Sequence, residues 1–215
     1  MNDDVKGSME QLIQSSNNIA VIPSQVGGVD AFAAALGLYF SLKEKDKKVS
    51  LVYSNEAPKG FEDLVIDKDL ITNPASRNLV VEIDYSKTSA EKVNYSTLND
   101  ILTLEISPVD STFNLDNVRA GLEGMGFDLI FVIGAQTKED LGVSYSSLEN
   151  VFRTAKVVNL DNTDKNTRFG DINVVDTRME SLSQLVMNFM VKVGFILNQR
   201  PAKALLKGIS YRTSN

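Results

Sequence analysis

Two short, mostly apolar runs that each end in an aspartate most constrain how this chain folds. The run Val157–Leu160 precedes Asp161, and the run Ile172–Val175 precedes Asp176. Runs of this length and composition predict buried strands, and the polar residues between them predict a loop. Open α/β sheets bind ligands outside the carboxyl ends of their strands. We therefore expect both aspartates at the edge where a ligand would lie.

Strand-like and helical stretches alternate through most of the chain. A strand-helix-strand pattern covers Ile19–Ile22, Asp30–Lys45 and Val49–Tyr53. It predicts parallel strands joined by a right-handed crossover. The other elements predicted for the same fold are a short helix and loop within Pro58–Asn73, a strand at Asp128–Ile133, helices at Thr137–Thr154 and Met179–Leu197, and a last helix starting at Pro201–Lys207. We expect an α/β fold in which a parallel sheet carries helices on both faces.

Two additions to this core are predicted within a single domain over residues 1–215. Residues 1–17 precede the core, 18–215, and hold an amphipathic helix at Val5–Gln14. Residues 78–108 hold strand-like runs without helical spacing, which predicts an antiparallel β insertion. Its three runs are Leu79–Asp84, Lys92–Ser96 and Ile101–Ile106, with Asn99-Asp100 as the turn between the last two.

Composition limits the chemistry open to the chain. It has no histidine and no cysteine, so imidazole and thiolate groups can serve neither as catalysts nor as metal ligands. The net charge of −6 disfavours a nucleic-acid partner. No apolar run approaches the roughly 18 residues of a membrane span, and the acidic start MNDDVKGSMEQ is unlike a signal peptide. We expect a cytoplasmic protein without membrane contact.

The segment around Asp161 resembles the third motif of the DHH phosphoesterases. In that family the strand ends in Asp-His-His and is often followed by Pro-Ser-Asn and Phe-Gly-x-Ile-Asn. Six positions match: Asp161, Asn166, Phe169, Gly170, Ile172 and Asn173. Asn162 and Thr163 replace the two histidines.

Three more segments resemble the family's other motifs in the same order along the chain. In the first, IPSQVGGVDA, Ser24 and Gly28 replace a histidine and an aspartate, while Asp30 is kept. In the second, Gly134 replaces the aspartate that ends the strand. In the fourth, LLKGISYRTSN, Arg212 replaces an aspartate. The resemblance spans Ile19–Thr213, and the run VEIDYSKTSAEKVNY also resembles an insertion in some bacterial members.

The resemblance implies a two-metal hydrolase frame that lacks most of its ligands. The family holds two divalent ions, typically Mn²⁺, between four or five Asp and His side chains, and here only Asp30 and Asp161 remain. Two carboxylates cannot offset the repulsion of two dications, although they could hold one solvated Mg²⁺. We expect no cofactor, with Mn²⁺ or Mg²⁺ involved only if activity remains. The family's second, substrate-binding domain is expected to be absent.

The surviving polar residues also have structural interpretations. Asp30 could cap its own helix, and Asp161 and Asn166 could form Asx turns. Gly27-Gly28 could form a tight turn or present its amides to an anion. Arg168 and Arg212 could be solvated surface residues or phosphate ligands.

Three functional hypotheses follow. The first is a catalytically inactive module for binding or assembly, with a protein partner or a second copy. The second is a residual nucleotide or oligonucleotide binder, in which Gly27, Asn166, Arg168 and Arg212 contact phosphate. The third is a divergent metal-dependent phosphodiesterase that uses Asp30 and Asp161. The lost ligands favour the first.

Overall fold

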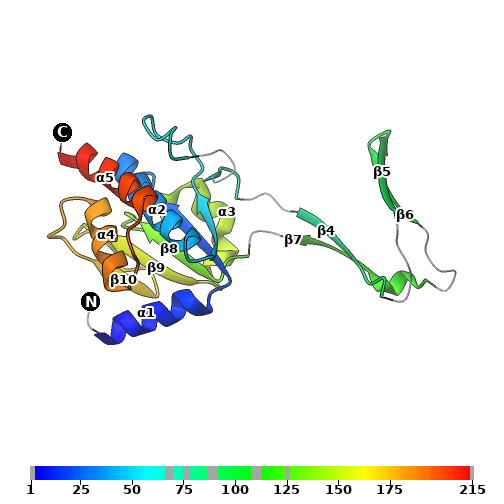
Figure 1. The fold of residues 1–215 in the computed structure, drawn as a ribbon, viewed down its shortest axis with the longest axis horizontal. Helices are drawn as coiled ribbons and strands as arrows, with labels where there is room; N and C mark the ends of the chain where they lie inside the picture. Colours follow the sequence, from blue (N-terminus) through cyan, green and yellow to red (C-terminus); the bar gives the residue numbers. More distant parts are fainter. Residues whose placement is uncertain are drawn as a thin grey trace. The chain divides into compact units, whose positions relative to one another are not determined.

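The computed structural model describes residues 3–65, 70–74, 78–86, 92–107, 113–123 and 126–213. The chain divides into two compact units (Figure 1). The larger combines Met1–Ala75 with Met125–Asn215, and the smaller is Ser76–Gly124. We refer to them as the sheet unit and the inserted unit.

The sheet unit is built on a parallel β-sheet, as the sequence predicts. Its strand order is β10-β9-β8-β1-β2-β3, and all the pairings are parallel. The strands are β1 (Asn18–Pro23), β2 (Lys48–Val52), β3 (Leu70–Ile71), β8 (Leu129–Ile133), β9 (Lys156–Asp161) and β10 (Ile172–Val175). The chain runs outward from β1 through β2 and β3, and then outward on the other side through β8, β9 and β10. The order therefore reverses between β1 and β8, where sheets of this kind bind ligands.

Successive side chains along a strand lie on opposite faces of the sheet and belong to two separate hydrophobic cores. Ile19 and Val21 of β1 join one cluster of buried residues, while Ala20 and Ile22 join the other. Helices α1 (Asp3–Ser15), α2 (Gly28–Lys43), α4 (Leu182–Lys192) and α5 (Gln199–Thr213) contribute to the first cluster, and α3 (Val143–Phe152) contributes to the second. Both faces of the sheet are thus covered by helices (Figure 1), which confirms the predicted architecture.

Helix α2 lies at the centre of the first core and is buried along most of its length. Because it is apolar on nearly every side, it can pack between the sheet and other helices. Gly37 permits close contact with α5, since a Cβ atom there would lie 2.6 Å from Cγ of Leu205. This packing fixes the N-terminal turn of α2, which carries Asp30.

Several predicted boundaries differ in the structure. The helix expected at Thr137–Thr154 is divided into a 3₁₀ turn (Lys138–Leu141) and α3, because Gly142 adopts a φ of +54°. Helix α4 is shorter than expected at both ends: Ser181 accepts a hydrogen bond from the Gln184 amide as N-cap, and Gly194, with φ of +74°, follows the helix.

The segment expected to hold a short helix, Pro58–Asn73, holds turns at residues 59–64 and the short strand β3, which the sequence did not reveal. Residues 66–69 of that prediction lie outside the described residues. No helix in the described part of the chain is both long and apolar enough to cross a membrane.

The inserted unit consists of two antiparallel pairs. Strand β5 (Lys92–Leu98) pairs with β6 (Ile101–Ser107), and β4 (Asn78–Ile83) pairs with β7 (Val118–Glu123), which a 3₁₀ turn (Leu115–Asn117) precedes. Asn99 and Asp100, with φ of 49° and 64°, form the predicted turn, and a two-residue loop with positive φ is typical of tight hairpins. Because β4 takes its partner from beyond residue 108, the inserted unit reaches Gly124, further than the predicted boundary.

Candidate functional site at the carboxyl edge of the sheet

The loops that follow β1, β8 and β9 surround a small cavity of about 230 Å³ at the carboxyl edge of the sheet. Six of the positions singled out from the sequence line it: Gly27, Asp30, Gly134, Asp161, Asn162 and Arg212. Val26, Gln136, Leu182 and Tyr211 also line it and were not predicted. The fold therefore brings the four family-like segments to one place.

Five other predicted positions are described but do not line this cavity: Ser24, Gly28, Thr163, Asn166 and Arg168. Most of them make hydrogen bonds that hold the surrounding loops. Fewer of the predicted polar side chains therefore line the cavity than the sequence motifs suggested.

Asp30 is buried and its carboxylate binds the start of helix α4. Oδ2 accepts a hydrogen bond from the Leu182 amide at 2.7 Å, and Oδ1 accepts from the Ser183 amide at 3.0 Å and its hydroxyl at 2.7 Å. One interpretation of Asp30 from the sequence is a cap of its own helix, α2, whose N-cap residue in the structure is Gly27. That interpretation is wrong, because the first amides of α4 carry the positive end of another helix dipole and lie within reach.

Leu182 occupies space between the loops of β1 and β8. A Cβ atom at Gly134 would lie 2.4 Å from Leu182 Cδ1, and one at Gly27 would lie 3.2 Å from the same methyl group. Gly134 also has a φ of +74°, which side chains other than glycine rarely adopt. The position that matches an aspartate in the family this chain resembles therefore faces a leucine methyl group, which a larger side chain would have to displace.

Ser24 joins the loops after β1 and β8. Its hydroxyl is buried, donates to the Gly134 carbonyl at 2.5 Å and accepts from the Gly27 amide at 3.0 Å. The Gly28 amide donates to the Gln25 carbonyl at 3.3 Å. The amides of the Gly27-Gly28 turn are thus used inside the protein, which favours a tight turn over an anion site.

Asp161 is also buried, and the loop that follows it supplies its hydrogen-bond donors. Oδ1 accepts from the Asn162 amide at 2.8 Å and Oδ2 accepts from Asn166 Nδ2 at 2.8 Å. Burial raises the pKa of the Asp161 carboxyl above its ordinary value, and these hydrogen bonds oppose that shift. Each oxygen of this carboxylate therefore already accepts a hydrogen bond from the β9 loop.

Asn166 holds the β9 loop against the β8 loop. It donates to the Ala135 carbonyl at 2.8 Å and accepts from the Arg168 amide at 2.8 Å, which is the Asx turn expected from the sequence. Asn159, buried in the middle of β9, donates to the same carbonyl at 3.2 Å. Sequence reasoning overlooked Asn159, although a polar residue inside an otherwise apolar strand signals a buried polar network.

Two of the remaining predicted positions, Asn162 and Arg212, donate to backbone carbonyls of the segment before α4. Asn162 Nδ2 donates to the Met179 carbonyl at 2.9 Å, and the Thr163 hydroxyl accepts from the Lys165 amide at 3.3 Å. Arg168 is exposed, with a φ of +56°. Arg212 is exposed and donates through Nε to the Glu180 carbonyl at 3.4 Å.

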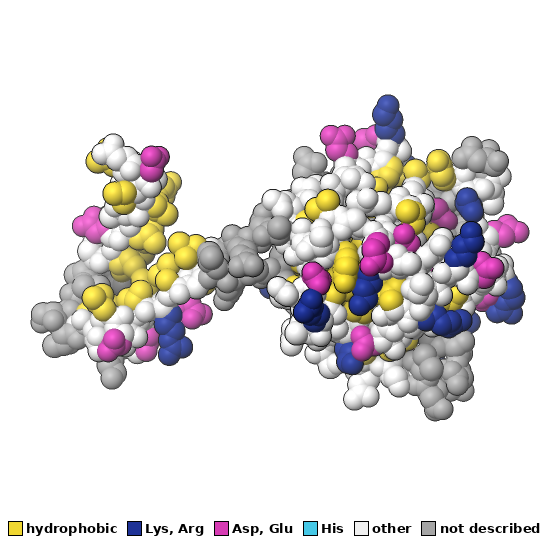
Figure 2. All heavy atoms as spheres, turned by 180° about the vertical axis from the view of Figure 1, so that it is seen from behind, with side chains coloured by type: hydrophobic (Ala, Val, Ile, Leu, Met, Phe, Trp, Pro, Cys, Tyr) yellow, Lys and Arg dark blue, Asp and Glu magenta, His cyan; other side chains and the backbone are white. Residues whose placement is uncertain are grey.

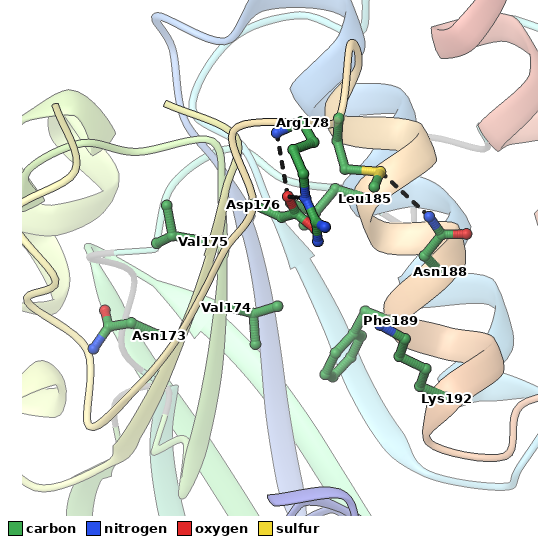
Figure 3. Close-up of a pocket in the computed structure, with 10 residues that line it drawn as sticks. Asn173, Val174, Val175, Asp176, Arg178, Leu185, Asn188, Phe189 and Lys192 are labelled. Atoms are coloured by element: carbon green, nitrogen blue, oxygen red, sulfur yellow. Dashed lines mark hydrogen bonds and ion pairs between the residues drawn. The ribbon is translucent and has the colours of Figure 1, made fainter. Parts of the chain in front are cut away.

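A second cavity, of about 370 Å³, lies between edge strand β10 and helix α4 (Figure 3). Val174, Leu185 and Phe189 give it apolar walls. At its rim Asp176 accepts two hydrogen bonds of 2.8 Å from the Arg178 guanidinium, which lowers the pKa of Asp176 to about 2. Asp176 therefore stands at a strand end, as expected, but points to its own neighbour in the chain and does not line the first cavity.

The carboxyl edge does not have the donor set of a two-metal site. Within the described ranges, no three Asp, Glu, His or Cys side chains are placed to hold one ion. The oxygens of Asp30 and Asp161 already accept five hydrogen bonds, three at Asp30 from the start of α4 and two at Asp161 from the β9 loop. Two dications would require several more anionic ligands.

Comparisons with known proteins support the fold. No protein-family model matches the sequence, and no curated protein matches it significantly. The crystal structure of an exopolyphosphatase-related protein from Bacteroides fragilis is similar to this chain, with a TM-score of 0.67 and 14% sequence identity. The match covers 99% of this chain and 51% of that one, so this chain spans about half the length of its structural neighbour. At this identity the likeness shows that the two chains share an α/β fold.

Proposed function

We propose that this chain is a divergent DHH-type domain that has lost metal-dependent hydrolysis and serves as a module for binding and assembly. The observation that carries the proposal is the use of Asp30, whose carboxylate receives the first amides of α4. A metal ligand at this position would leave those amides without their acceptor. The domain thus uses an ancestral ligand position to join two helices.

Two further observations support the loss of hydrolysis. The leucine side chain of Leu182 fills the space beside Gly134, where the family pattern has an aspartate. Asp161 lies in a hydrogen-bond network with Asn162 and Asn166, and burial raises its pKa. A metal ion at Asp161 would therefore have to replace the hydrogen bonds that its oxygens accept from Asn162 and Asn166.

Calorimetric titration with Mn²⁺, together with hydrolysis assays on polyphosphate and on a dinucleotide in Mn²⁺, tests the proposal. We expect neither heat of site-specific binding nor turnover above that of buffer. Asp161→Asn removes a carboxylate that lines the cavity, and Asp164→Asn removes an exposed one from the same loop as a matched control. Mn²⁺-dependent hydrolysis that Asp161→Asn abolishes and Asp164→Asn preserves would overturn the proposal.

Nucleotide binding is the second candidate, because Arg212 and Tyr211 line the 230 Å³ cavity. Asp30 and Asp161 oppose it by placing acidic groups in the same wall. Titration with a dinucleotide at low salt distinguishes nucleotide binding from the proposed assembly function. This candidate predicts salt-sensitive binding that weakens at least about tenfold in Arg212→Gln and less in Arg168→Ala, and a flat titration rejects it.

A further inference from the structure

The hairpin formed by β5 and β6 has one apolar face. In its register Val93 stands opposite Ile106, Tyr95 opposite Leu104, and Thr97 opposite Leu102. Side chains alternate between the two faces of a strand, so these six residues share one face, which we call the hairpin face. The opposite face is polar except at the turn, with pairs such as Asn94 and Glu105 or Ser96 and Thr103.

The hairpin face is open to solvent. The exposed fractions are 68% for Val93, 78% for Tyr95, 58% for Leu102 and 51% for Leu104. Hydrophobic side chains are visible along the inserted unit in Figure 2. A two-stranded hairpin is only marginally stable alone in water, and an apolar cluster of this kind typically marks an interaction surface.

The second ribbon of the inserted unit has the same pattern. Leu79 and Val81 of β4 lie on one face, and Val81 stands opposite Ala120 of β7. Both β4 residues are exposed. Two separate strand pairs therefore each present an apolar face. Isolated surface leucines, which are common in soluble proteins, do not explain this pattern.

We propose that the hairpin face binds the hairpin face of a second copy of this chain, so that the inserted unit forms a homodimer. This names the partner of the assembly module proposed above and rests on that function. None of the six residues of the face is charged. Contact between two hairpin faces therefore buries no unpaired charge. In a two-fold symmetric dimer each copy contributes the same face, so the contact is self-complementary.

The exposed area suits a weak dimer. An exposed aliphatic side chain offers roughly 60–120 Å² and a tyrosine roughly 150–250 Å². With the exposures above, the hairpin face offers about 300 Å² per copy. A pair of hairpin faces therefore buries roughly 600 Å², an area typical of weak, transient contacts between proteins.

Charge argues against an anionic membrane as the occupant. The hairpin, residues 92–107, has one basic residue, Lys92, against Asp100 and Glu105, and the whole chain has a net charge of −6. Surfaces that bind anionic lipids usually gather several Lys or Arg residues. A second copy requires no such attraction.

Sedimentation equilibrium of the full chain over about 1 to 200 µM tests the proposal. We expect a mass that rises with concentration from 23.6 kDa toward twice that value. Leu102→Thr with Leu104→Thr should weaken the dimer at least about 100-fold, while threonine keeps the strand propensity. Leu98→Thr is the matched control: Leu98 is 74% exposed but pairs with Ile101 on the opposite face, and its dimer should match the wild type.

Cysteine cross-linking tests the face without removing apolar contacts. The chain has no native cysteine, so Thr97→Cys on the hairpin face and Ser96→Cys on the opposite face can be compared directly. We expect at least about tenfold more disulfide-linked dimer from Thr97→Cys under mild oxidation. Equal yields, or a wild-type chain that stays monomeric at every concentration, would overturn the proposal.

Two other results separate this inference from the proposed function. A monomer that also shows no Mn²⁺-dependent hydrolysis would reject the dimer and leave the loss of hydrolysis standing. Sedimentation of the chain with phosphatidylserine vesicles, lost in Leu102→Thr with Leu104→Thr, would replace the second copy with a membrane surface and overturn the inference.

Discussion

The sheet unit and the inserted unit place their apolar side chains in opposite environments. In the sheet unit Ile19, Val21 and Leu129 are completely buried between the sheet and its helices. In the inserted unit Tyr95 and Leu104 are exposed although they stand opposite each other in an ordered register. Both units follow the same rules of strand alternation, so the difference lies in whether a second layer covers the apolar face.

The two units also differ in how they use polar groups. The carboxyl edge of the sheet unit consumes its carboxylates in internal hydrogen bonds, as Asp30 does with α4 and Asp161 with the β9 loop. The inserted unit instead leaves apolar side chains such as Tyr95 and Leu104 exposed. The contrast is therefore between a sheet unit whose buried carboxylates are hydrogen-bonded internally and an inserted unit whose apolar side chains face solvent. Substitutions in the two units test this contrast.

Asp30→Ala should give the largest loss of stability. It removes three hydrogen bonds to a buried carboxylate and leaves the first amides of α4 without an acceptor. Charge-assisted hydrogen bonds and helix caps each contribute about 1–3 kcal/mol, so we expect the free energy of unfolding to fall by about 3–5 kcal/mol. Urea denaturation measures this loss. Asp164→Ala, at an exposed position, is the control and should change it by less than about 0.5 kcal/mol.

An unchanged free energy of unfolding in Asp30→Ala would contradict this expectation. It would mean that the carboxylate is not required by the fold and remains available to a ligand. In an active hydrolase, loss of a metal ligand is expected to leave the metal-free fold intact. The inference that the carboxylates of the sheet unit serve the fold would then be wrong.

Gly134→Ala combined with Leu182→Ala tests whether the leucine fills the carboxyl edge. Gly134→Ala should cost about 2–4 kcal/mol, because it forces a side chain into a positive φ and against Leu182 Cδ1. Leu182→Ala should cost about 2–4 kcal/mol, since Leu182 is buried. Because the second change removes the clashing methyl group, the double variant should be at least about 1 kcal/mol more stable than the sum predicts. Strictly additive losses in denaturation experiments would show that Leu182 does not occupy that space.

Asp161 should make stability depend on pH in the direction opposite to that of most carboxylates. Burial raises its pKa in the folded state, so the folded state binds the proton more tightly than the unfolded state does. The free energy of unfolding should therefore fall as pH rises from the ordinary carboxyl value of about 4 through the raised pKa. Urea midpoints measured across this window check the sign.

Asp161→Asn should remove this part of the pH dependence and cost about 1 kcal/mol at neutral pH, because one of the two acceptor contacts is lost. Asp164→Asn is the control for general charge effects. If the pH profiles of the wild type and Asp161→Asn coincide, Asp161 titrates as an exposed carboxyl and the closed network around Asn166 is not formed.

Most of the sheet unit could be predicted from the sequence, because its signals are local. Apolar runs such as Ile19–Ile22 and their spacing from the helix at Asp30–Lys45 suffice to predict a parallel sheet. The break at Gly142 was overlooked because the residues around it have acceptable helix propensity. Strand β7 (Val118–Glu123) was overlooked because Ala120 and Gly121 weaken the strand pattern.

The chemistry of the site was harder to predict because it depends on contacts distant in sequence. Asp30 binds amides 152 and 153 residues further along the chain, and no local preference could reveal that α4 begins there. The filling of the edge by Leu182 depends on the same docking. The Asx turn at Asn166 was predicted, since its partner, Arg168, is two residues away.

The smallest effect is expected from apolar residues of the inserted unit. Leu98→Thr and Leu79→Thr remove exposed leucines, so each should change the free energy of unfolding of the sheet unit by less than about 0.5 kcal/mol. Leu129→Thr, the same substitution at a completely buried position of β8, should cost about 3–5 kcal/mol and is the matched comparison. Urea unfolding at a protein concentration low enough to keep the chain monomeric measures both. A loss above about 2 kcal/mol in Leu79→Thr would mean that the apolar face of the β4–β7 ribbon is already covered within the monomer, and the contrast between a closed sheet unit and an open inserted unit would no longer hold.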